Sequence, residues 1–287
     1  MNIHWKNEQL TITGASGYFS PRGIFESGQC FRFTCDDGGV WSGVAGTRRI
    51  YVTSNGSDII IHPVPTQEYS LYLQKYFDLD RDYPGIADKL CARDSIMRKA
   101  TSGRLGIRIL RQDPFETLIS FIISQNNNIP RITKIVNSLC ALYGETRTDE
   151  GGDYHLFPTP KAMLDGGIEG LDTIKAGFRA KYIYAAAKAV SEGPLDLAAL
   201  EQSGTGELIG ELCKVYGVGV KIASCVALFA YGRFDSFPID VWIKRVMADY
   251  YGSKSHEELF GEYAGIAQQY LFCYIREINK GANNPNG

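Results

Sequence analysis

The chain has 287 residues, of which 44% are hydrophobic, and its 30 basic and 32 acidic side chains give a formal net charge of −2. These values are ordinary for a globular protein of one large or two modest domains. The charge mildly disfavours a nucleic-acid binder, although a basic face can coexist with an acidic surface elsewhere. No stretch approaches the ~20 apolar residues of a membrane span, and no signal peptide opens the chain, so a membrane protein is excluded.

The N-terminal region has a strand pattern. Short apolar runs are separated by turn residues such as 36–39, and the predicted strands are Leu10–Thr13, Cys30–Phe33, Val40–Val44, Arg49–Val52 and Asp58–His62. They predict an antiparallel sheet of about five strands. The run Ser27-Gly28-Gln29-Cys30-Phe31-Arg32 stands at the second of them.

From Thr66 the apolar period becomes helical, and a helix is predicted over 66–77. The rest of the chain is expected to be helical with short loops, ending in a frayed tail from Lys280. We therefore predict an α+β fold in which a twisted antiparallel β domain, residues 1–79 with a linking helix, packs on a helical domain, residues 80–287.

Two polar segments interrupt the helical region. Gln112-Asp113-Pro114 opens a helix that ends near Ser124, three asparagines from Asn126 to Asn128 follow, and Pro130 opens the next helix. Phe178 and Arg179 precede an alanine-rich helix over Ile183–Val190. Taken alone, these segments indicate an ordinary interhelical turn, a core aromatic residue and a surface charge.

The stretch from Val215 to Cys225 contains Gly217-Val218-Gly219 between two apolar helical runs. It predicts a helix-hairpin-helix over about 207–231, because glycines permit a sharp turn and a close backbone approach. The free N–H groups that open the second helix suit a phosphate.

Lys221 and Asp240 carry the candidate chemistry. Lys221 lies in the first helical turn among apolar neighbours, where the dipole and burial both favour a neutral, nucleophilic amine. Asp240, in Pro238-Ile239-Asp240-Val241, is predicted to be a helix N-cap. A lone lysine is more often a solvated surface group, and a lone aspartate at this position is more often only a cap.

The last long helix contains Gln268 and Phe272, four residues apart and therefore on one face. Taken in chain order, these motifs resemble the 8-oxoguanine DNA glycosylases of the helix-hairpin-helix superfamily, and the resemblance covers nearly the whole chain. Each motif is weak alone, but five in the family's order are highly specific.

The resemblance implies roles in reading the lesion. The Gly28 carbonyl accepts a hydrogen bond from N7–H of 8-oxoguanine, a proton that guanine lacks. Gln268 reads the Watson–Crick edge and Phe272 stacks on the base. Cys225 forms the opposite wall, and Pro238 also belongs to the base pocket.

The resemblance also implies contacts with the DNA. Asn126 fills the gap in the stack, Phe178 wedges into the duplex, and Arg131 and Arg179 contact the orphan cytosine. This set predicts a preference for cytosine opposite the lesion, with a phenylalanine where the family usually has a tyrosine. The hairpin glycines, Gly217 and Gly219, bring backbone N–H groups to phosphates.

The implied reaction is base excision followed by strand cutting. Asp240 stabilises positive charge on the sugar, and Lys221 attacks C1′ and forms a Schiff base that allows β-elimination. The expected partner of a monomeric enzyme is duplex DNA containing 8-oxoguanine. No cofactor is expected, and no metal bound by side chains, although the hairpin carbonyls could bind a structural metal ion.

The sequence departs from the family pattern at two places and leaves two other functions open. Val215-Tyr216 replaces the usual Leu-Pro before the hairpin, and Trp242 replaces a histidine near a phosphate. One alternative is a monofunctional alkylpurine glycosylase in which Asp240 activates water. The other is a non-catalytic DNA-binding module.

The cysteines and histidines bear on the compartment and on metals. Seven cysteines include no Cys-x-x-Cys pair, and four histidines are scattered, so a zinc ribbon and a four-cysteine iron–sulfur cluster lack their ligands. Free thiols in a reducing intracellular compartment are expected, cytoplasmic or nucleoid-associated if the source is prokaryotic.

Overall fold

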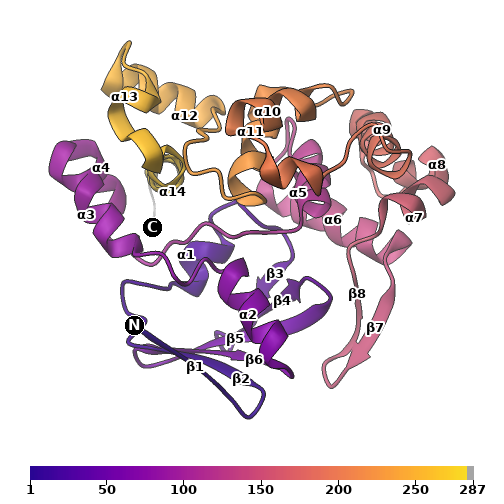
Figure 1. The fold of residues 1–287 in the computed structure, drawn as a ribbon, viewed down its shortest axis with the longest axis horizontal. Helices are drawn as coiled ribbons and strands as arrows, with labels where there is room; N and C mark the ends of the chain where they lie inside the picture. The colour runs from indigo at the N-terminus through magenta and orange to yellow at the C-terminus, as the bar shows by residue number, and fades with distance from the viewer. Residues whose placement is uncertain (283–287) are drawn as a thin grey trace. The chain divides into compact units, whose positions relative to one another are not determined.

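The computed structural model describes residues 1–282 (Figure 1). They form two compact units, each assembled from separate stretches of the chain. Unit 1 contains Met1–Gln29, Val52–Arg111 and the chain from Gly232 onward, and unit 2 contains Cys30–Tyr51 and Gln112–Tyr231.

A six-stranded sheet has the order β1-β2-β6-β5-β4-β3, and its pairs β1·β2, β2·β6 and β3·β4 are antiparallel. Its strands are β1 (Asn2–Lys6), β2 (Gln9–Thr13), β3 (Phe33–Cys35), β4 (Trp41–Ala45), β5 (Arg48–Asn55) and β6 (Asp58–His62). Strand β5 passes from unit 2 into unit 1. This sheet, together with the helices that follow it, confirms the predicted α+β class.

Two details of the predicted sheet were wrong. The strand expected at Cys30–Phe33 begins only at Phe33, because Cys30 and Phe31 are both buried and therefore break the alternation of a strand. The sheet has six strands rather than about five, because β1 is mostly exposed and its alternation is limited to two apolar residues, Ile3 and Trp5, which is too short a pattern to predict a strand.

The helices of unit 1 include α14, which packs against α4, α12 and α13. The predicted helix over 66–77 is confirmed as α2, and Thr66 caps it by accepting a hydrogen bond from Tyr69 N. The frayed tail expected from Lys280 lies partly within α14, and residues 283–287 lie outside the described residues. The elements are α1 (Pro21–Phe25), α2 (Gln67–Tyr76), α3 (Tyr83–Arg93), α4 (Ser95–Thr101), α12 (Val241–Val246), η3 (Met247–Tyr251), α13 (His256–Phe260), η4 (Gly261–Tyr263) and α14 (Ala264–Ala282).

In unit 2, α5 packs against α6, α9 and α11, and Phe121 of α5 stacks on Phe229 of α11 with ring centroids 5.5 Å apart. The elements are α5 (Pro114–Ile123), α6 (Ile129–Tyr143), β7 (Thr146–Asp149), β8 (Gly152–His155), α7 (Pro160–Asp165), α8 (Gly167–Thr173), η1 (Gly177–Arg179), α9 (Ala180–Ser191), η2 (Ala199–Gln202), α10 (Thr205–Cys213) and α11 (Val220–Phe229).

The expectation of an entirely helical C-terminal region was wrong at the β7–β8 hairpin. Its residues are mostly exposed, so they show no apolar alternation that would predict strands. Polar side chains hold it instead. Asp149 accepts a hydrogen bond from Gly151 N at 2.8 Å across the turn and pairs with Arg49.

Candidate functional site

The predicted helix-hairpin-helix is present in unit 2 as α10, a tight turn and α11. Gly217 has φ +87°, and a Cβ there would lie 2.3 Å from Cδ1 of Tyr182, so the fold itself requires glycine. Gly219 differs, because its φ is −103° and nothing lies within 4 Å of an added Cβ. It is the N-cap of α11, and no side chain accepts a hydrogen bond from the first N–H groups of this helix.

Lys221 lies in the first turn of α11 and is partly buried. Its Nζ is 3.4 Å from Oγ of Ser124 and 5.2 Å from the ring centroid of Phe121. Among the described residues of unit 2 no carboxylate pairs with it, so no acidic group of its own unit neutralises the amine. Cys225 follows one turn later, buried and outside any disulfide.

The three asparagines connect α5 to α6 beside this amine. Asn128 caps α6 by accepting a hydrogen bond from Arg131 N at 3.0 Å. Asn126 is exposed at φ +46°, a conformation that asparagine tolerates better than most residues. The preceding Gln125 donates from Nε2 to Gly217 O at 3.2 Å, which ties the asparagine loop to the hairpin.

Arg179 also binds the loop that contains the three asparagines. Its guanidinium donates to Gln125 O at 2.8 Å and to Asn126 O at 2.9 Å, and only 3% of the residue is exposed. Burial, and then the nearby charge of Arg131, lower the pKa of Arg179. The hydrogen bonds of Arg179 therefore go to backbone carbonyls, and its guanidinium carbon also lies 4.4 Å from the Phe178 ring centroid, whereas Arg131 is exposed.

Phe178 is the first ring of an aromatic series in unit 2. It is 49% exposed and meets Tyr182 edge-to-face at 6.1 Å, and Tyr182 meets Tyr216 at 5.1 Å. The Lys181 ammonium lies 5.3 Å from the Tyr182 ring and 5.8 Å from the Tyr216 ring. Sequence reasoning missed Lys181 and Tyr182, whose only signal was their position directly after Phe178.

Asp240 in unit 1 is the N-cap of α12, as the sequence predicted. Its Oδ1 accepts hydrogen bonds from Trp242 N at 3.0 Å and Ile243 N at 2.8 Å, and among residues 1–282 its Oδ2 accepts none. Pro238 before it is buried, and the Trp242 ring lies 5.4 Å from the Arg245 guanidinium carbon. The cap therefore occupies one carboxylate oxygen and leaves the other for a ligand.

The other predicted base-reading residues of unit 1 lie on α14 and on the loop after α1. Gln268 is 5% exposed, and its Oε1 has no hydrogen-bond partner among the described residues. Phe272 follows one helical turn later and is partly buried. Gly28 has φ +82°, which favours glycine, and Ser27 beside it accepts a hydrogen bond from Gln269 at 2.9 Å. Gln269 was missed because two successive glutamines in a helix do not show which of them is structural.

The structure groups the predicted residues into two sets. Unit 2 brings together Lys221, Cys225, the hairpin glycines, the asparagine loop and the Phe178–Arg179 pair, whereas unit 1 brings together Gly28, Gln268 and Phe272 and also contains Pro238, Asp240 and Trp242.

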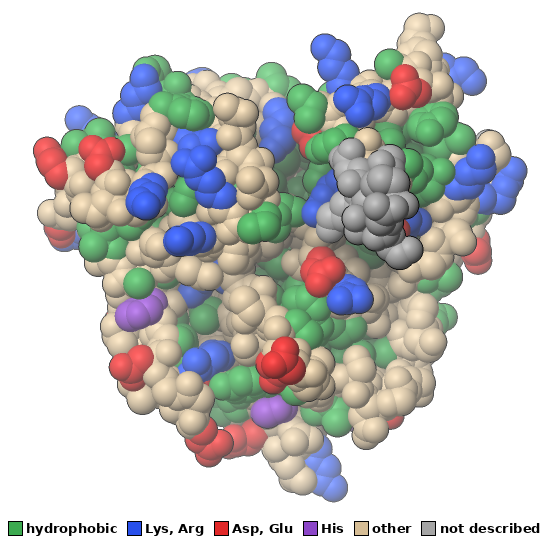
Figure 2. Space-filling view, turned by 180° about the vertical axis from the view of Figure 1, so that it is seen from behind, with side chains coloured by type: hydrophobic (Ala, Val, Ile, Leu, Met, Phe, Trp, Pro, Cys, Tyr) green, Lys and Arg blue, Asp and Glu red, His purple; other side chains and the backbone are tan. Residues whose placement is uncertain are grey.

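Charged side chains of both signs lie on the surface. The face in Figure 2 shows Lys and Arg side chains among hydrophobic and acidic ones. Within residues 1–282, no three His, Cys, Asp or Glu side chains cluster as metal ligands. No helix in that range combines the length and apolar character that a membrane span needs.

Comparison with known proteins adds independent information. Residues 11–118 match the family model described as "8-oxoguanine DNA glycosylase, N-terminal domain", and residues 119–263 match "HhH-GPD superfamily base excision DNA repair protein". An Arabidopsis thaliana relative, "N-glycosylase/DNA lyase OGG1", is 29% identical over 86% of this chain and 75% of its own length. A Saccharomyces cerevisiae "N-glycosylase/DNA lyase" is 36% identical over 61% of this chain and 50% of its own.

Solved structures agree over almost the full length. The structure of MBOgg1 with a low-affinity DNA ligand is 38% identical, with a TM-score of 0.91, and the match covers 97% of this chain and 99% of that one. The Clostridium acetobutylicum 8-oxoguanine glycosylase/lyase, solved with duplex DNA containing cytosine opposite 8-oxoguanine, is 35% identical over 97% and 99% of the two chains, with a TM-score of 0.89.

The fold and the hairpin with its lysine define a base excision DNA repair protein of the helix-hairpin-helix class. The match at residues 11–118 and the full-length structural relatives narrow this class. The chain belongs to the 8-oxoguanine DNA glycosylase/AP lyase family, and it is a DNA N-glycosylase with lyase activity at apurinic or apyrimidinic sites.

Proposed function

We propose that this enzyme excises 8-oxoguanine from duplex DNA, prefers cytosine opposite the lesion, and cuts the strand through a Schiff base on Lys221. The observation that supports this substrate is that Gln268 is buried and its Oε1 has no hydrogen-bond partner among the described residues. A buried acceptor without a partner is costly unless a ligand satisfies it, and a purine with N–H groups on its Watson–Crick edge is such a ligand. The Clostridium acetobutylicum relative solved with 8-oxoguanine opposite cytosine supports the same substrate.

In this proposal the base is read by three groups of unit 1. Gln268 receives N–H groups of the Watson–Crick edge, and the Phe272 ring stacks on the base. The Gly28 carbonyl accepts from N7–H, which 8-oxoguanine has and guanine lacks. Pro238 and Cys225 are proposed to complete the pocket walls.

The chemical step balances without a cofactor. As the N9–C1′ bond breaks, its electrons leave with the base, which gains a proton, and the Lys221 amine forms a bond to C1′. Opening of the sugar ring gives a protonated Schiff base, which acidifies the C2′ proton. Loss of that proton expels the 3′ phosphate, and hydrolysis restores the amine. Asp240 stabilises the positive charge on the sugar through the oxygen that its cap does not use.

The contacts with the DNA stack and with the orphan cytosine are assigned to unit 2. The Asn126 tip fills the vacated position in the stack, and Phe178, which is 49% exposed, wedges beside it. We assign cytosine recognition chiefly to the exposed Arg131, with Arg179 holding the loop and joining the cytosine contact if DNA draws it outward.

We assign the binding of DNA phosphates to the hairpin. Open space and uncapped N–H groups at Gly219 suit a phosphate oxygen, and Gly217 shapes the turn. The carbonyls of Tyr216 and Val218 accept no hydrogen bond among the described residues and are oxygen ligands suited to a structural metal ion. Trp242 takes the position of a phosphate-contacting residue. A monomer acting on DNA inside a reducing compartment fits seven cysteines that form no disulfide among the described residues.

A gel assay with 8-oxoguanine opposite each of the four bases, with and without borohydride, tests the proposal. Lys221→Gln should lose base release and borohydride trapping while it still binds lesion duplex, and Lys214→Gln, which removes an exposed lysine paired with Glu211, should retain both activities. Asp240→Asn keeps a cap acceptor and should slow base release by about 10²–10³-fold. Equal rates of base release opposite all four bases would contradict the cytosine preference. Borohydride trapping by Lys221→Gln would contradict the assignment of the Schiff base to that lysine.

The same assay separates the alternatives. A monofunctional alkylpurine glycosylase would release base without trapping, and a non-catalytic module would give no product at any enzyme concentration. Solved 3-methyladenine glycosylases resemble this chain at 19–22% identity, which shows the shared fold alone.

A further inference from the structure

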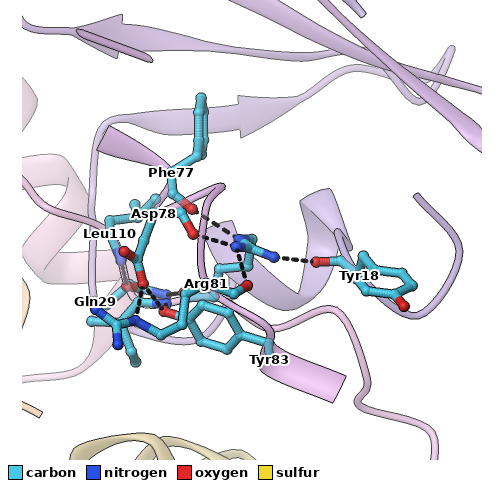
Figure 3. A network of polar contacts seen from close by, with 9 residues as sticks. Tyr18, Gln29, Phe77, Asp78, Arg81, Tyr83 and Leu110 are labelled. Atoms are coloured by element: carbon cyan, nitrogen blue, oxygen red, sulfur yellow. Dashed lines mark hydrogen bonds and ion pairs between the residues drawn. The ribbon is translucent and has the colours of Figure 1, made fainter. Parts of the chain in front are cut away.

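The loop that carries Gly28 is anchored by a buried glutamine of its own. Gln29 is 1% exposed, and its Nε2 donates to Ser27 Oγ at 2.9 Å and to Arg108 O at 2.8 Å. Its Oε1 accepts from Leu110 N at 2.8 Å, a bond that lies within the polar network of Figure 3. This anchor fixes the side of the loop that follows Gly28.

A second glutamine, from a distant part of the sequence, fixes the side that precedes Gly28. Gln269 of α14 donates from Nε2 to Ser27 O at 2.9 Å, and both residues are 2% exposed. The Ser27 carbonyl belongs to the planar peptide group that enters Gly28. The bond therefore restrains the orientation from which the Gly28 carbonyl is projected.

Gln269 directly follows Gln268, and Phe272 lies one turn further along the same helix. A rigid helix with a 1.5 Å rise per residue transmits the position of one of these side chains to the others. A hydrogen bond between α14 and Ser27 thus holds the base-reading helix at a fixed separation from the lesion-sensing loop.

Arg276 makes a weaker link between the same elements. It donates to Glu26 O at 3.3 Å, and its guanidinium carbon lies 5.2 Å from the Phe272 ring centroid. This bond is exposed, so competition with water makes it worth less than the buried bond of Gln269.

We propose that Gln269 is a positioning residue for substrate selectivity. Its bond to Ser27 O fixes the position of the Gly28 carbonyl relative to Gln268 and Phe272, and this position determines how well the enzyme discriminates 8-oxoguanine from guanine. This inference rests on the proposed function. One hydrogen-bond acceptor separates the two bases, and a displacement of about 1 Å in such a contact can cost as much as 10²-fold. Losing the Gln269 bond should therefore reduce the selectivity for 8-oxoguanine over guanine and leave the reactivity of the Lys221 amine unchanged.

The test compares Gln269→Met, which keeps the side-chain volume and removes the donor, with Gln74→Met. Gln74 donates to Ser70 one turn away in α2 and serves as the matched control. In the Lys221→Gln background, the dissociation constants of duplexes containing 8-oxoguanine or guanine give the binding selectivity. We expect their ratio to fall about 5- to 50-fold with Gln269→Met and to stay constant with Gln74→Met.

Borohydride trapping on an abasic duplex supplies a second readout, because that substrate has no base to read. With Lys221 intact, Gln269→Met should trap abasic DNA at the wild-type rate, and a general loss of structure would lower trapping and selectivity together. Should Gln269→Met fail to fold, Arg276→Met, which removes the exposed bond to Glu26 O and the contact with the Phe272 ring, should lower the selectivity ratio about 2- to 5-fold. Unchanged selectivity in whichever of these variants folds would overturn the inference. A wild-type enzyme that traps abasic DNA and does not release 8-oxoguanine would instead overturn the proposed substrate.

Discussion

The two hairpin glycines offer a sharp test, because the structure gives them different reasons to be glycine. At Gly217, φ is +87° and an added Cβ would lie 2.3 Å from two carbons of the Tyr182 ring. At Gly219, φ is −103° and an added Cβ meets nothing within 4 Å. We predict that Gly217→Ala destabilises the fold, whereas Gly219→Ala chiefly impairs DNA binding.

The magnitude for Gly217→Ala has two parts. A non-glycine residue in the left-handed region costs about 1–2 kcal/mol. Displacing the Tyr182 ring, which is also in contact with Phe178 and Tyr216, adds about 1–3 kcal/mol of overpacking. The total is about 2–5 kcal/mol. Gly219→Ala loses only the N-cap preference for glycine over alanine, on the order of 0.5–1 kcal/mol.

Urea denaturation provides the stability values, and equilibrium binding to lesion duplex provides the affinities. The double variant Gly217→Ala with Tyr182→Ala should recover the steric part, so the coupling energy in a double-mutant cycle should be about 1–3 kcal/mol. Gly219→Ala should lose affinity roughly 10-fold or more, since its methyl group occupies the space proposed for a phosphate. Equal destabilisation by the two alanines, or zero coupling with Tyr182, would contradict a steric role for Gly217.

Four further predictions concern binding, stability and thiol reactivity. Arg131→Ala should reduce the preference for cytosine by about 1–3 kcal/mol without shifting the melting temperature, and an unchanged preference would contradict its role. Arg179→Met should weaken lesion binding about 10- to 100-fold and speed amide exchange over 125–128, because Gln125 O and Asn126 O lose their donor. Arg108→Met should cost about 3–5 kcal/mol in urea unfolding, because the buried guanidinium serves four carbonyls. Burial raises the pKa of Cys140 to about 12, so at pH 8 its labelling by a disulfide reagent should be about 10³-fold slower than that of an ordinary thiol and should rise with pH, while exposed Cys35 reacts first and Cys35→Ser removes the fast phase.

Features set by short-range rules were predictable from the sequence. Asp113 caps α5 and Asp240 caps α12, and the glycine turn with its flanking helices lies where the spacing placed it. Caps and turns depend on a few neighbouring residues, so their signals survive in one sequence. The family pattern then supplied what local rules could not, namely the hypothesis that motifs more than 200 residues apart serve one reaction.

The supporting contacts were not predictable, because they join distant residues of ordinary type. Nothing in the sequence shows that Arg179 faces carbonyls of the asparagine loop rather than solvent, or that Gln269 and not Gln268 bonds to Ser27. Strands β1, β7 and β8 were not predicted for a related reason. Their residues are mostly exposed, and β7 and β8 lack apolar alternation while β1 has only Ile3 and Trp5, so pairing with a neighbouring strand is what defines them.

Three consecutive residues at the end of α5 link the parts of unit 2 that have different proposed roles. Ser124 contacts the Lys221 amine, Gln125 bonds to the hairpin, and Asn126 projects at the exposed tip while Arg179 holds its carbonyl. Successive Cα atoms are 3.8 Å apart, so the Cα atoms of Ser124 and Asn126 are separated by at most about 7–8 Å. That separation is on the order of two base-stacking steps of 3.4 Å. In the proposed function, the hydrogen bonds of Gln125 and Arg179 therefore link the position of the Lys221 amine to that of Asn126, the residue proposed to fill the gap in the DNA stack.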